Sequence, residues 1–342
     1  MIHKLQGLFV STLVLSAGIF FCFIGSEVFV RYVVDDGMDY NLEMWKYARK
    51  LKRASEDPVQ GHKHIPNRSA HLMGVDIAIN SHGHRNKEIA MNKPPGITRV
   101  AMLGDSLTFG WGVPSKDTVS ARLEVLLNKN KSGKRFEVIN AGIGNTNTEM
   151  QVVRFLADEV NFSPDIVVLN YFINDAEPIP RPNKNILMQY SASYVFFSLR
   201  IASIGRMFFG GKQWRQYYLD LYKEEYEGWK RMRFFFKKLS EYCRQKNIKL
   251  VLVNYPELHQ FQPYSFTVVT QKLKNMADEE EVLFFDLFPI LQEQKEEKLW
   301  VSRQDQHPNS FACSLIARAI NDFFEKHFYV SKPTLSIISD GQ

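Results

Sequence analysis

The sequence has few cysteines, no internal repeats and no low-complexity tract. Its three cysteines are widely and unevenly spaced, which excludes a disulfide framework and gives no zinc-binding pattern. Basic and acidic residues interleave and no nucleic-acid motif accompanies the net charge of +6, so we expect no nucleic-acid partner. With 45% hydrophobic and 23% charged residues, the composition is that of a globular protein with ample apolar material for a core.

One long apolar segment is present, near the N-terminus. Residues 8–24 carry no charge, and apolar residues resume after Glu27. About 20 helical residues cross the hydrocarbon core of a membrane. The segment is longer than the apolar part of a signal peptide and lacks a good small-residue cleavage site. We therefore expect residues 1–34 to be an uncleaved single-pass anchor in the cytoplasmic membrane, with the rest of the chain on the extracytoplasmic side. A cleaved signal peptide is the alternative.

Residues 35–98 are expected to form a stalk and an N-terminal extension. Within them, residues 40–53 have the pattern of a short amphipathic helix rich in basic and aromatic side chains. Such a helix either lies at a membrane interface or packs on the domain that follows. The pattern alone favours neither interpretation.

Histidines separated by one residue occur twice in this extension, and they raise the question of zinc. The pairs are His62 with His64 and His82 with His84. Strong zinc signatures have tighter and more complete ligand spacing, and no matching third ligand follows. We expect these histidines to pack in loops or to lie on the surface, and we predict no metal.

Short apolar runs alternate with segments of helical periodicity beyond residue 98. Such runs, typical of buried strands, occur at residues 99–103, 136–139, 165–171, 249–254 and 282–286. Helical patterns follow at residues 120–128 and 148–159, and the last one ends near residue 326. The alternation predicts a flavodoxin-like doubly wound parallel sheet with helices on both faces.

The turn after the first strand carries a candidate nucleophile. It contains Gly104, Asp105 and Ser106, and a helix follows. In α/β enzymes a strand, a small-residue turn and a helix present a group at the carboxyl end of the strand. The N-terminus of the helix stabilises negative charge. Ser106 is therefore a candidate nucleophile and Asp105 a candidate acceptor of loop hydrogen bonds, although Ser106 could also serve only as a helix cap.

Three further segments place polar groups at the ends of predicted strands or helices. The loop at residues 140–145 consists of small residues that can bring backbone N–H groups close to a ligand. Asn174, followed by Asp175, ends the third strand, where its amide can donate to an oxyanion. Asp305 and His307 open the last helix, and imidazole is suited to act as a base near neutral pH.

Four blocks of the sequence, in this order, resemble the SGNH (GDSL) hydrolase family: residues 104–106, 140–145, 174–175 and 305–307. The resemblance extends over residues 99 to about 326. The resemblance implies that Ser106 is the nucleophile, that His307 is the general base, and that Asp305 orients it. It also implies an oxyanion hole formed by the Ser106 N–H, a backbone N–H of the second block and the Asn174 side chain. Gly104, Asp105 and Asp175 would support the site, and no cofactor or metal is implied.

Two positions depart from the family pattern. The second block usually has glycine where this chain has Asn145, directly after Gly144, so the source of the backbone donor stays open between these two residues. Asparagine tolerates the left-handed backbone conformation better than most residues. The family acid commonly lies three residues before the histidine, where this chain has Gln304. If Asp305 cannot reach Nδ1 of His307, a Ser–His dyad oriented by a backbone carbonyl would remain.

We expect the hydrolase domain to span residues 99–328, with a tail at 329–342. An apolar insertion at residues 178–230 is interpreted as a lid or cap near the membrane. The upstream segment at residues 80–85 resembles one in membrane-anchored bacterial members, which often occur with polysaccharide assembly or modification systems.

The expected function is therefore hydrolysis or transfer of an ester-linked acyl group. An O-acetylated glycan is the preferred substrate class, which includes the option of an O-acetyltransferase, and a lipid ester is the next. The alternative is a non-catalytic module of this fold that binds or scaffolds cell-surface polysaccharide, which the departures at Gln304 and Asn145 would favour.

Overall fold

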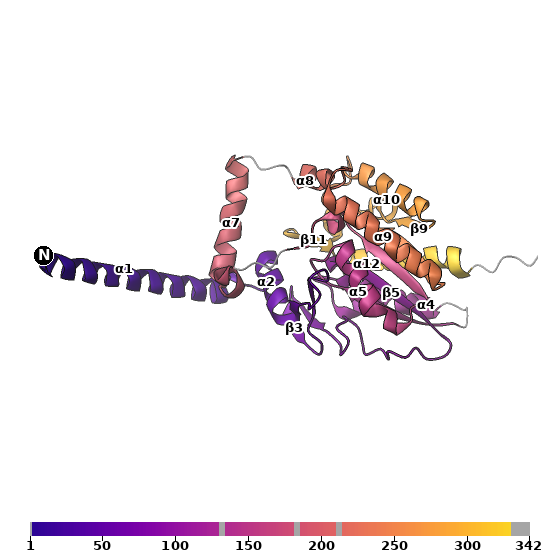
Figure 1. Cartoon of the computed structure of the whole chain (residues 1–342), viewed down its shortest axis with the longest axis horizontal. Helices are drawn as coiled ribbons and strands as arrows, with labels where there is room; N and C mark the ends of the chain where they lie inside the picture. Colours follow the sequence, from indigo (N-terminus) through magenta and orange to yellow (C-terminus); the bar gives the residue numbers. More distant parts are fainter. Residues whose placement is uncertain (1, 130–133, 181–184, 210–213, 330–342) are drawn as a thin grey trace, which may run out of the picture.

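The computed structural model describes residues 2–129, 134–180, 185–209 and 214–329. Residues 330–342 of the expected tail lie outside the described part. The chain consists of a long N-terminal helix, an extension with one helix and short strands, and an α/β domain (Figure 1). The α/β domain carries the residues that the sequence singles out.

Five parallel strands form the central sheet, in the order β6-β5-β7-β8-β9. Their bounds are β5 (Ile97–Gly104), β6 (Arg135–Gly142), β7 (Ile166–Tyr171), β8 (Lys249–Asn254) and β9 (Leu283–Asp286). This is the flavodoxin-like order, in which ligands bind at the carboxyl ends of the strands beside the point where the strand order reverses. The predicted doubly wound parallel sheet is confirmed.

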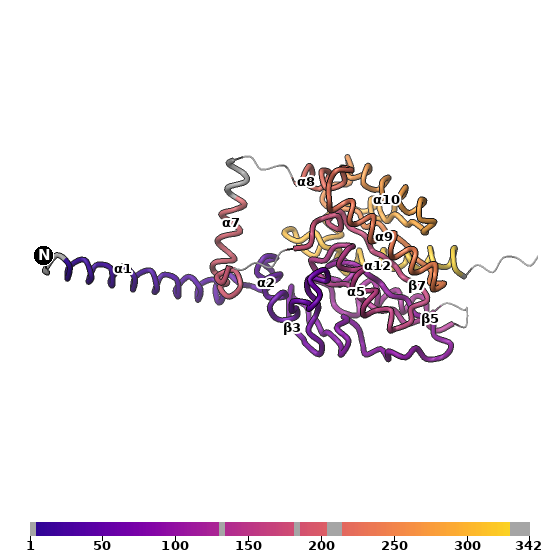
Figure 2. Tube along the Cα trace, viewed as in Figure 1, coloured from indigo at the N-terminus to yellow at the C-terminus, as the bar shows by residue number. Residues whose placement is uncertain are grey.

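Helices cover both faces of the sheet (Figures 1 and 2). On one face lie α5 (Thr148–Ala157), α9 (Glu227–Gln245) and α10 (Thr267–Glu279), and on the other lie α4 (Val119–Lys129) and α12 (Ser310–Phe324). Each layer buries its apolar stripe against the strands, which are themselves buried on both faces. The core thus fixes the carboxyl ends of β5, β6 and β7 relative to one another.

The N-terminal extension packs on the domain through α2 (Tyr40–Leu51). Its side chains Tyr47 and Leu51 are buried in one cluster with Phe109 and Trp111, which follow β5. Two antiparallel strand pairs complete the extension: β1 (Lys52–Ala54) with β2 (His62–His64), and β3 (Ser69–Leu72) with β4 (Val75–Ala78). The extension is therefore a wall of the region around the turn after β5.

Asp305 and His307 lie in a strand and not at the opening of the last helix. This strand, β11 (Asp305–Pro308), pairs with β10 (Trp300–Ser302) in a short hairpin. The helix α12 begins only at Ser310, and the Asn309 side chain caps it by accepting from the N–H groups of Phe311 and Ala312. The two strands of this hairpin are too short and too polar for an apolar alternation to predict them.

The N-terminal helix α1 (Ile2–Phe29) continues into a π-helical turn (Val30–Val34) and extends away from the domain (Figure 2). The stretch Leu5–Val34 is long and apolar enough to cross a membrane, and none of its apolar window is buried. The insertion helix α7 (Ala192–Phe209) starts beside the end of α1 and runs across its direction (Figure 1). Glu27 caps α7 by accepting from the N–H groups of Ala192 and Ser193 at 2.9 and 3.0 Å.

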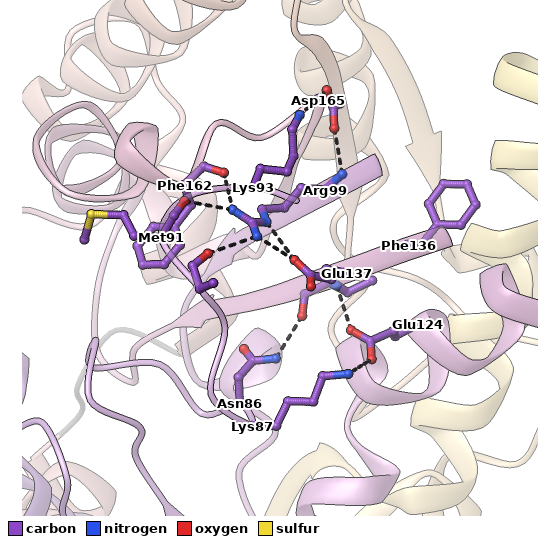
Figure 3. Close-up of polar contacts among 12 residues, drawn as sticks. Asn86, Lys87, Met91, Lys93, Arg99, Glu124, Phe136, Glu137, Phe162 and Asp165 are labelled. Carbon is purple, nitrogen blue, oxygen red and sulfur yellow. Dashed lines mark hydrogen bonds and ion pairs between the residues drawn. The ribbon is translucent and has the colours of Figure 1, made fainter. Parts of the chain in front are cut away.

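A buried arginine joins the sheet to the loops at the amino ends of the strands (Figure 3). The Arg99 guanidinium donates to Oε2 of Glu137 on β6 at 3.0 and 2.6 Å and to the carbonyl of Phe162 at 2.6 Å. Its backbone N–H donates to Oδ2 of Asp165 at 2.7 Å. This network lies at the end of the sheet opposite the candidate site residues, so it serves the fold.

Replacing Arg99 with methionine is expected to lower the free energy of unfolding by about 3 kcal/mol or more. The variant leaves the Glu137 carboxylate and the Phe162 carbonyl without their donor, and an uncompensated partner of a buried pair is costly. The measurement is urea unfolding of the full chain in detergent. Lys93→Met is the matched control, because it removes a more exposed ion pair to Asp165 and should cost under about 1 kcal/mol. Equal losses in both variants would contradict the assignment.

Candidate active site

The turn after β5 holds Ser106 at the first position of the short helix α3 (Ser106–Phe109). Oδ1 of Asp105 caps this helix by accepting from the Leu107 N–H at 2.9 Å. Gly104 has a φ of +156°, and a Cβ there would lie 2.0 Å from Oγ1 of Thr108, so only glycine fits. The turn thus places the Ser106 hydroxyl at the carboxyl end of β5, beside β7.

The structure brings Ser106, His307 and Asp305 into one hydrogen-bonded chain. Oγ of Ser106 lies 2.8 Å from Nε2 of His307, and Nδ1 of His307 lies 2.5 Å from Oδ1 of Asp305. Asp305 therefore reaches Nδ1, and the arrangement does not need a backbone carbonyl in its place. The side chain of Gln304, at the position of the usual family acid, is exposed.

Trp111 holds the other oxygen of the Asp305 carboxylate. Its indole Nε1–H donates to Oδ2 of Asp305 at 2.9 Å, while Oδ1 accepts from both Nδ1 and the backbone N–H of His307. A carboxylate accepts only, so Nδ1 carries the proton and Nε2 is left with a lone pair. That tautomer can accept the proton of the Ser106 hydroxyl.

Asn174 lies beside the nucleophile turn, in the 3₁₀ turn Ile173–Ala176 that follows β7. One N–H of its amide donates to Oδ2 of Asp105 at 3.0 Å, which leaves the second N–H available. Burial raises the pKa of Asp105 above its usual range, and the hydrogen bonds from Leu107 and Asn174 oppose this shift. Asn174 is thus fixed by the same carboxylate that caps α3.

Asp175 has a structural position behind Asn174. Its carboxylate accepts from the Phe172 N–H and from the Gln151 side chain, both at 2.8 Å, and from Oγ1 of Thr148 at 3.1 Å. Burial raises the pKa of Asp175 well above its usual range, and the nearby Asp105 charge adds to this effect. These bonds tie the turn after β7 to α5.

The loop after β6 runs next to the nucleophile turn. The Ile143 N–H donates to the carbonyl of Gly104 at 3.1 Å. The Gly144 N–H is engaged, because it donates to the Tyr47 hydroxyl at 3.1 Å. Asn145 has a φ of +63°, a left-handed conformation that asparagine adopts more readily than most residues other than glycine. Of the two candidate donors left open by the sequence, the geometry favours the Asn145 N–H.

A cavity of about 220 Å³ lies beside His307. Its walls include the apolar side chains of Leu107, Phe172 and Leu291. Tyr40 closes it from the N-terminal extension, with its ring 5.9 Å from the His307 ring. The volume is below the roughly 300–1,000 Å³ of sites for drug-sized ligands. No described residue of the 178–230 insertion lines this cavity.

The histidine pairs of the extension have other partners. Nε2 of His62 lies 3.0 Å from the Gly144 carbonyl, and Nε2 of His64 lies 2.7 Å from the Tyr47 hydroxyl. His84 pairs with Glu159 at 2.7 Å. Within the described ranges, no group of three or more His, Cys, Asp or Glu side chains is placed to hold a metal ion.

Comparison with known proteins gives one family. The model described as the GDSL-like Lipase/Acylhydrolase family matches residues 102–311. No curated protein matches the chain. The family model spans the residues from the end of β5 to the start of α12 and so includes each block discussed above.

Similar solved structures include a putative lipolytic protein of the G-D-S-L family from Desulfitobacterium hafniense DCB-2, with 16% identity, a TM-score of 0.42, and coverage of 66% of this chain and 98% of that one. A catalytic mutant of an acetylxylan esterase from Geobacillus stearothermophilus has 17% identity and a TM-score of 0.44, with coverage of 65% and 92%. A two-domain esterase active on acetylated mannans has 16% identity and a TM-score of 0.45, with coverage of 67% and 49%.

Proposed function

The chain belongs to the GDSL-like lipase/acylhydrolase family, and from this premise we propose that it is a serine esterase with Ser106 as nucleophile. The observation that carries the proposal is the hydrogen-bonded chain from Oγ of Ser106 through His307 to Asp305. A serine hydroxyl attacks an ester only when a base removes its proton during the attack. His307, held by Asp305 in the tautomer with a free Nε2, supplies that base.

The reaction has two halves. Oγ of Ser106 forms a bond to the ester carbonyl carbon while its proton passes to Nε2 of His307. The intermediate collapses, the ester bond breaks, and His307 returns the proton to the leaving alkoxide. Water, or a hydroxyl of a second substrate, then attacks the acyl-serine by the same route in reverse. Hydrolysis and acyl transfer therefore use the same residues and differ only in the acceptor.

Negative charge on the former carbonyl oxygen would meet three donors. These are the Ser106 N–H at the start of α3, the Asn145 N–H and the free N–H of the Asn174 amide. Such donors stabilise the transition state because they are fixed before the charge develops.

Replacing Asn174 with alanine is expected to lower kcat by about 10²–10³-fold with little change in KM, since the lost bond is made chiefly to the transition state. The measurement is steady-state hydrolysis of p-nitrophenyl acetate. Asn161→Ala removes an exposed asparagine far from the turn and should leave kcat unchanged. An unchanged kcat in Asn174→Ala would exclude the asparagine from the oxyanion hole.

The preferred substrate class is an O-acetylated glycan, with hydrolysis or transfer of the acetyl group. The small cavity beside His307 supports a short acyl chain. The resemblance of residues 80–85 to members that occur with polysaccharide systems supports a glycan. A lipid ester is the second candidate, and a non-catalytic module that binds polysaccharide is the alternative outside enzymes.

The test is labelling of the purified full chain with a fluorophosphonate, followed by hydrolysis of p-nitrophenyl acetate and p-nitrophenyl octanoate. We expect labelling and a higher kcat/KM for the acetate ester. A preference for octanoate would favour a lipid ester. A folded protein that neither labels nor hydrolyses either ester would contradict the esterase proposal, and binding of acetylated polysaccharide would then be measured.

We also propose that α1 anchors the enzyme in the cytoplasmic membrane, with the α/β domain on the extracytoplasmic side. The exposed apolar surface of Leu5–Val34 supports this placement. Because α7 starts beside the end of α1 and runs across its direction, it would lie along the membrane surface. Its apolar side chains Phe197 and Ile201 are exposed, which suits contact with lipid. The mass of the mature protein extracted from membranes tests retention of the anchor, since a cleaved N-terminus would exclude it.

A further inference from the structure

One peptide group of the loop after β6 is held from outside the α/β domain. Two side chains of the extension, from the paired strands β1 and β2, approach the carbonyl of Gly144. Nζ of Lys52 lies 3.1 Å from this oxygen, and Nε2 of His62 lies 3.0 Å from it. Tyr47 of α2 holds the other side of the same residue, because its hydroxyl accepts from the Gly144 N–H. None of these three side chains belongs to the four blocks that carry the candidate site.

The Gly144 carbonyl and the Asn145 N–H belong to the same peptide group. A trans peptide is planar, and its C=O and N–H point in opposite directions. Nε2 of His62 also lies 3.3 Å from Nζ of Lys52, and in the tautomer with the proton on Nε2 His62 donates to the carbonyl beside Lys52. Two donors on the carbonyl then determine where the Asn145 N–H points, on the side away from Lys52 and His62. The loop is itself tied to the nucleophile turn through the Ile143 N–H.

The donors also act on the electronics of the peptide. Hydrogen bonds to a carbonyl polarise the peptide group, so that its N–H becomes a stronger donor. A cationic donor has a larger effect than a neutral one. Lys52 is therefore placed both to orient and to strengthen the Asn145 N–H, without contacting the substrate.

We propose that Lys52 and His62 are positioning residues of the oxyanion hole, which hold the Gly144–Asn145 peptide so that the Asn145 N–H faces the oxyanion. The inference rests on the proposed function, because it assumes the Ser106 reaction and the Asn145 donor. It assigns the N-terminal extension a part in catalysis in addition to its packing on the domain.

The burial of the Lys52 ammonium group lowers the stability of the folded chain, and this cost supports a functional role for Lys52. Burial lowers the pKa of Lys52 to about 7. Burial and the Lys52 charge lower the pKa of His62 to about 4, so the His62 imidazole is neutral near pH 7. The depressed pKa of Lys52 means that the unfolded chain binds its proton more tightly. The free energy of unfolding is therefore lowered by the full amount below pH 7. This loss disappears as the pH rises toward the ordinary lysine pKa of about 10.4.

The decisive variant is Lys52→Met in the full chain, with kcat, KM and Tm measured together at pH 6.5. We expect kcat for p-nitrophenyl acetate to fall by roughly 10-fold or more, a part of the 10²–10³-fold cost of losing an oxyanion donor. KM should be nearly unchanged, and Tm should stay level or rise. Arg53→Met, on the next residue of β1 with an exposed side chain, is the matched control and should leave all three unchanged. An unchanged kcat, or a fall in kcat that accompanies a lower Tm, would overturn the inference.

Two further measurements separate this inference from the esterase proposal. His62→Gln keeps an N–H donor and should retain more kcat than His62→Leu, with Lys63→Leu on the same strand as control. Hydrogen exchange of the peptide that contains Gly144 should be faster in Tyr47→Phe and Lys52→Met than in the wild type. Unchanged hydrogen exchange would show that Tyr47 and Lys52 do not hold the Gly144–Asn145 peptide, whatever the activity. The wild type could instead show the expected differences in hydrogen exchange but neither react with the fluorophosphonate nor hydrolyse the ester. That result would refute the esterase proposal and with it the catalytic part of this inference.

Discussion

Replacing Ser106 with alanine is expected to abolish ester hydrolysis, with kcat at least about 10⁴-fold below the wild type. The variant removes the atom that forms the acyl intermediate, so only the stabilisation of a water attack by the oxyanion hole would remain. The fold should be retained, because the Ser106 hydroxyl is hydrogen-bonded to His307 of the same site and Asp105 still caps α3. The measurement is p-nitrophenyl acetate hydrolysis beside fluorophosphonate labelling.

The control for this prediction is Ser115→Ala, which removes an exposed serine of the same domain. It should hydrolyse and label as the wild type does. Mass spectrometry of the labelled wild type should place the phosphonyl group on the peptide that contains Ser106. Hydrolysis retained in Ser106→Ala, or a label on another residue, would refute the nucleophile assignment.

The strands of the central sheet could be predicted because their burial on both faces leaves a continuous apolar run. The run at residues 249–254 coincides with β8, and the other four differ from the strands by at most a few residues at each end. The paired strands of the extension and the β10–β11 hairpin were missed. They have three or four residues each and carry polar side chains, so neither periodicity nor apolar content distinguishes them from loops.

The residues of the candidate site also fall into those that the sequence could predict and those that it could not. Ser106, Asn174 and His307 could be singled out because each follows or precedes a recognisable element. Trp111, Tyr47 and Lys52 could not, because each acts on a partner far along the chain. The separations are 194 residues from Trp111 to Asp305, 97 from Tyr47 to Gly144 and 92 from Lys52 to Gly144. Only the fold brings such pairs together, and a single sequence carries no local signal for them.

Replacing His307 with alanine is expected to lower kcat by at least about 10⁴-fold, and replacing Asp305 with asparagine should have a large but smaller effect. The histidine carries the proton, whereas the carboxylate only selects the tautomer and stabilises the imidazolium. Gln304→Ala, at the position of the usual family acid, is the control: its exposed side chain lines the cavity, but Nδ1 of His307 is held by Asp305, so most of the activity should remain. Wild-type activity in Asp305→Asn would mean that another group orients the imidazole.

Trp111 makes the reason for the Asp305→Asn loss testable. Its Nε1–H would hold the amide oxygen of the new asparagine, which turns the amide N–H groups toward Nδ1 of His307. That contact favours the tautomer with a proton on Nε2, which cannot accept the Ser106 proton. In the double variant Asp305→Asn with Trp111→Phe, the amide is free to rotate and offer its oxygen to Nδ1. We therefore expect the double variant to recover part of the kcat lost by Asp305→Asn, although Trp111→Phe alone should lower kcat. A double variant less active than Asp305→Asn would show that Trp111 supports the site by packing and not by orienting the carboxylate.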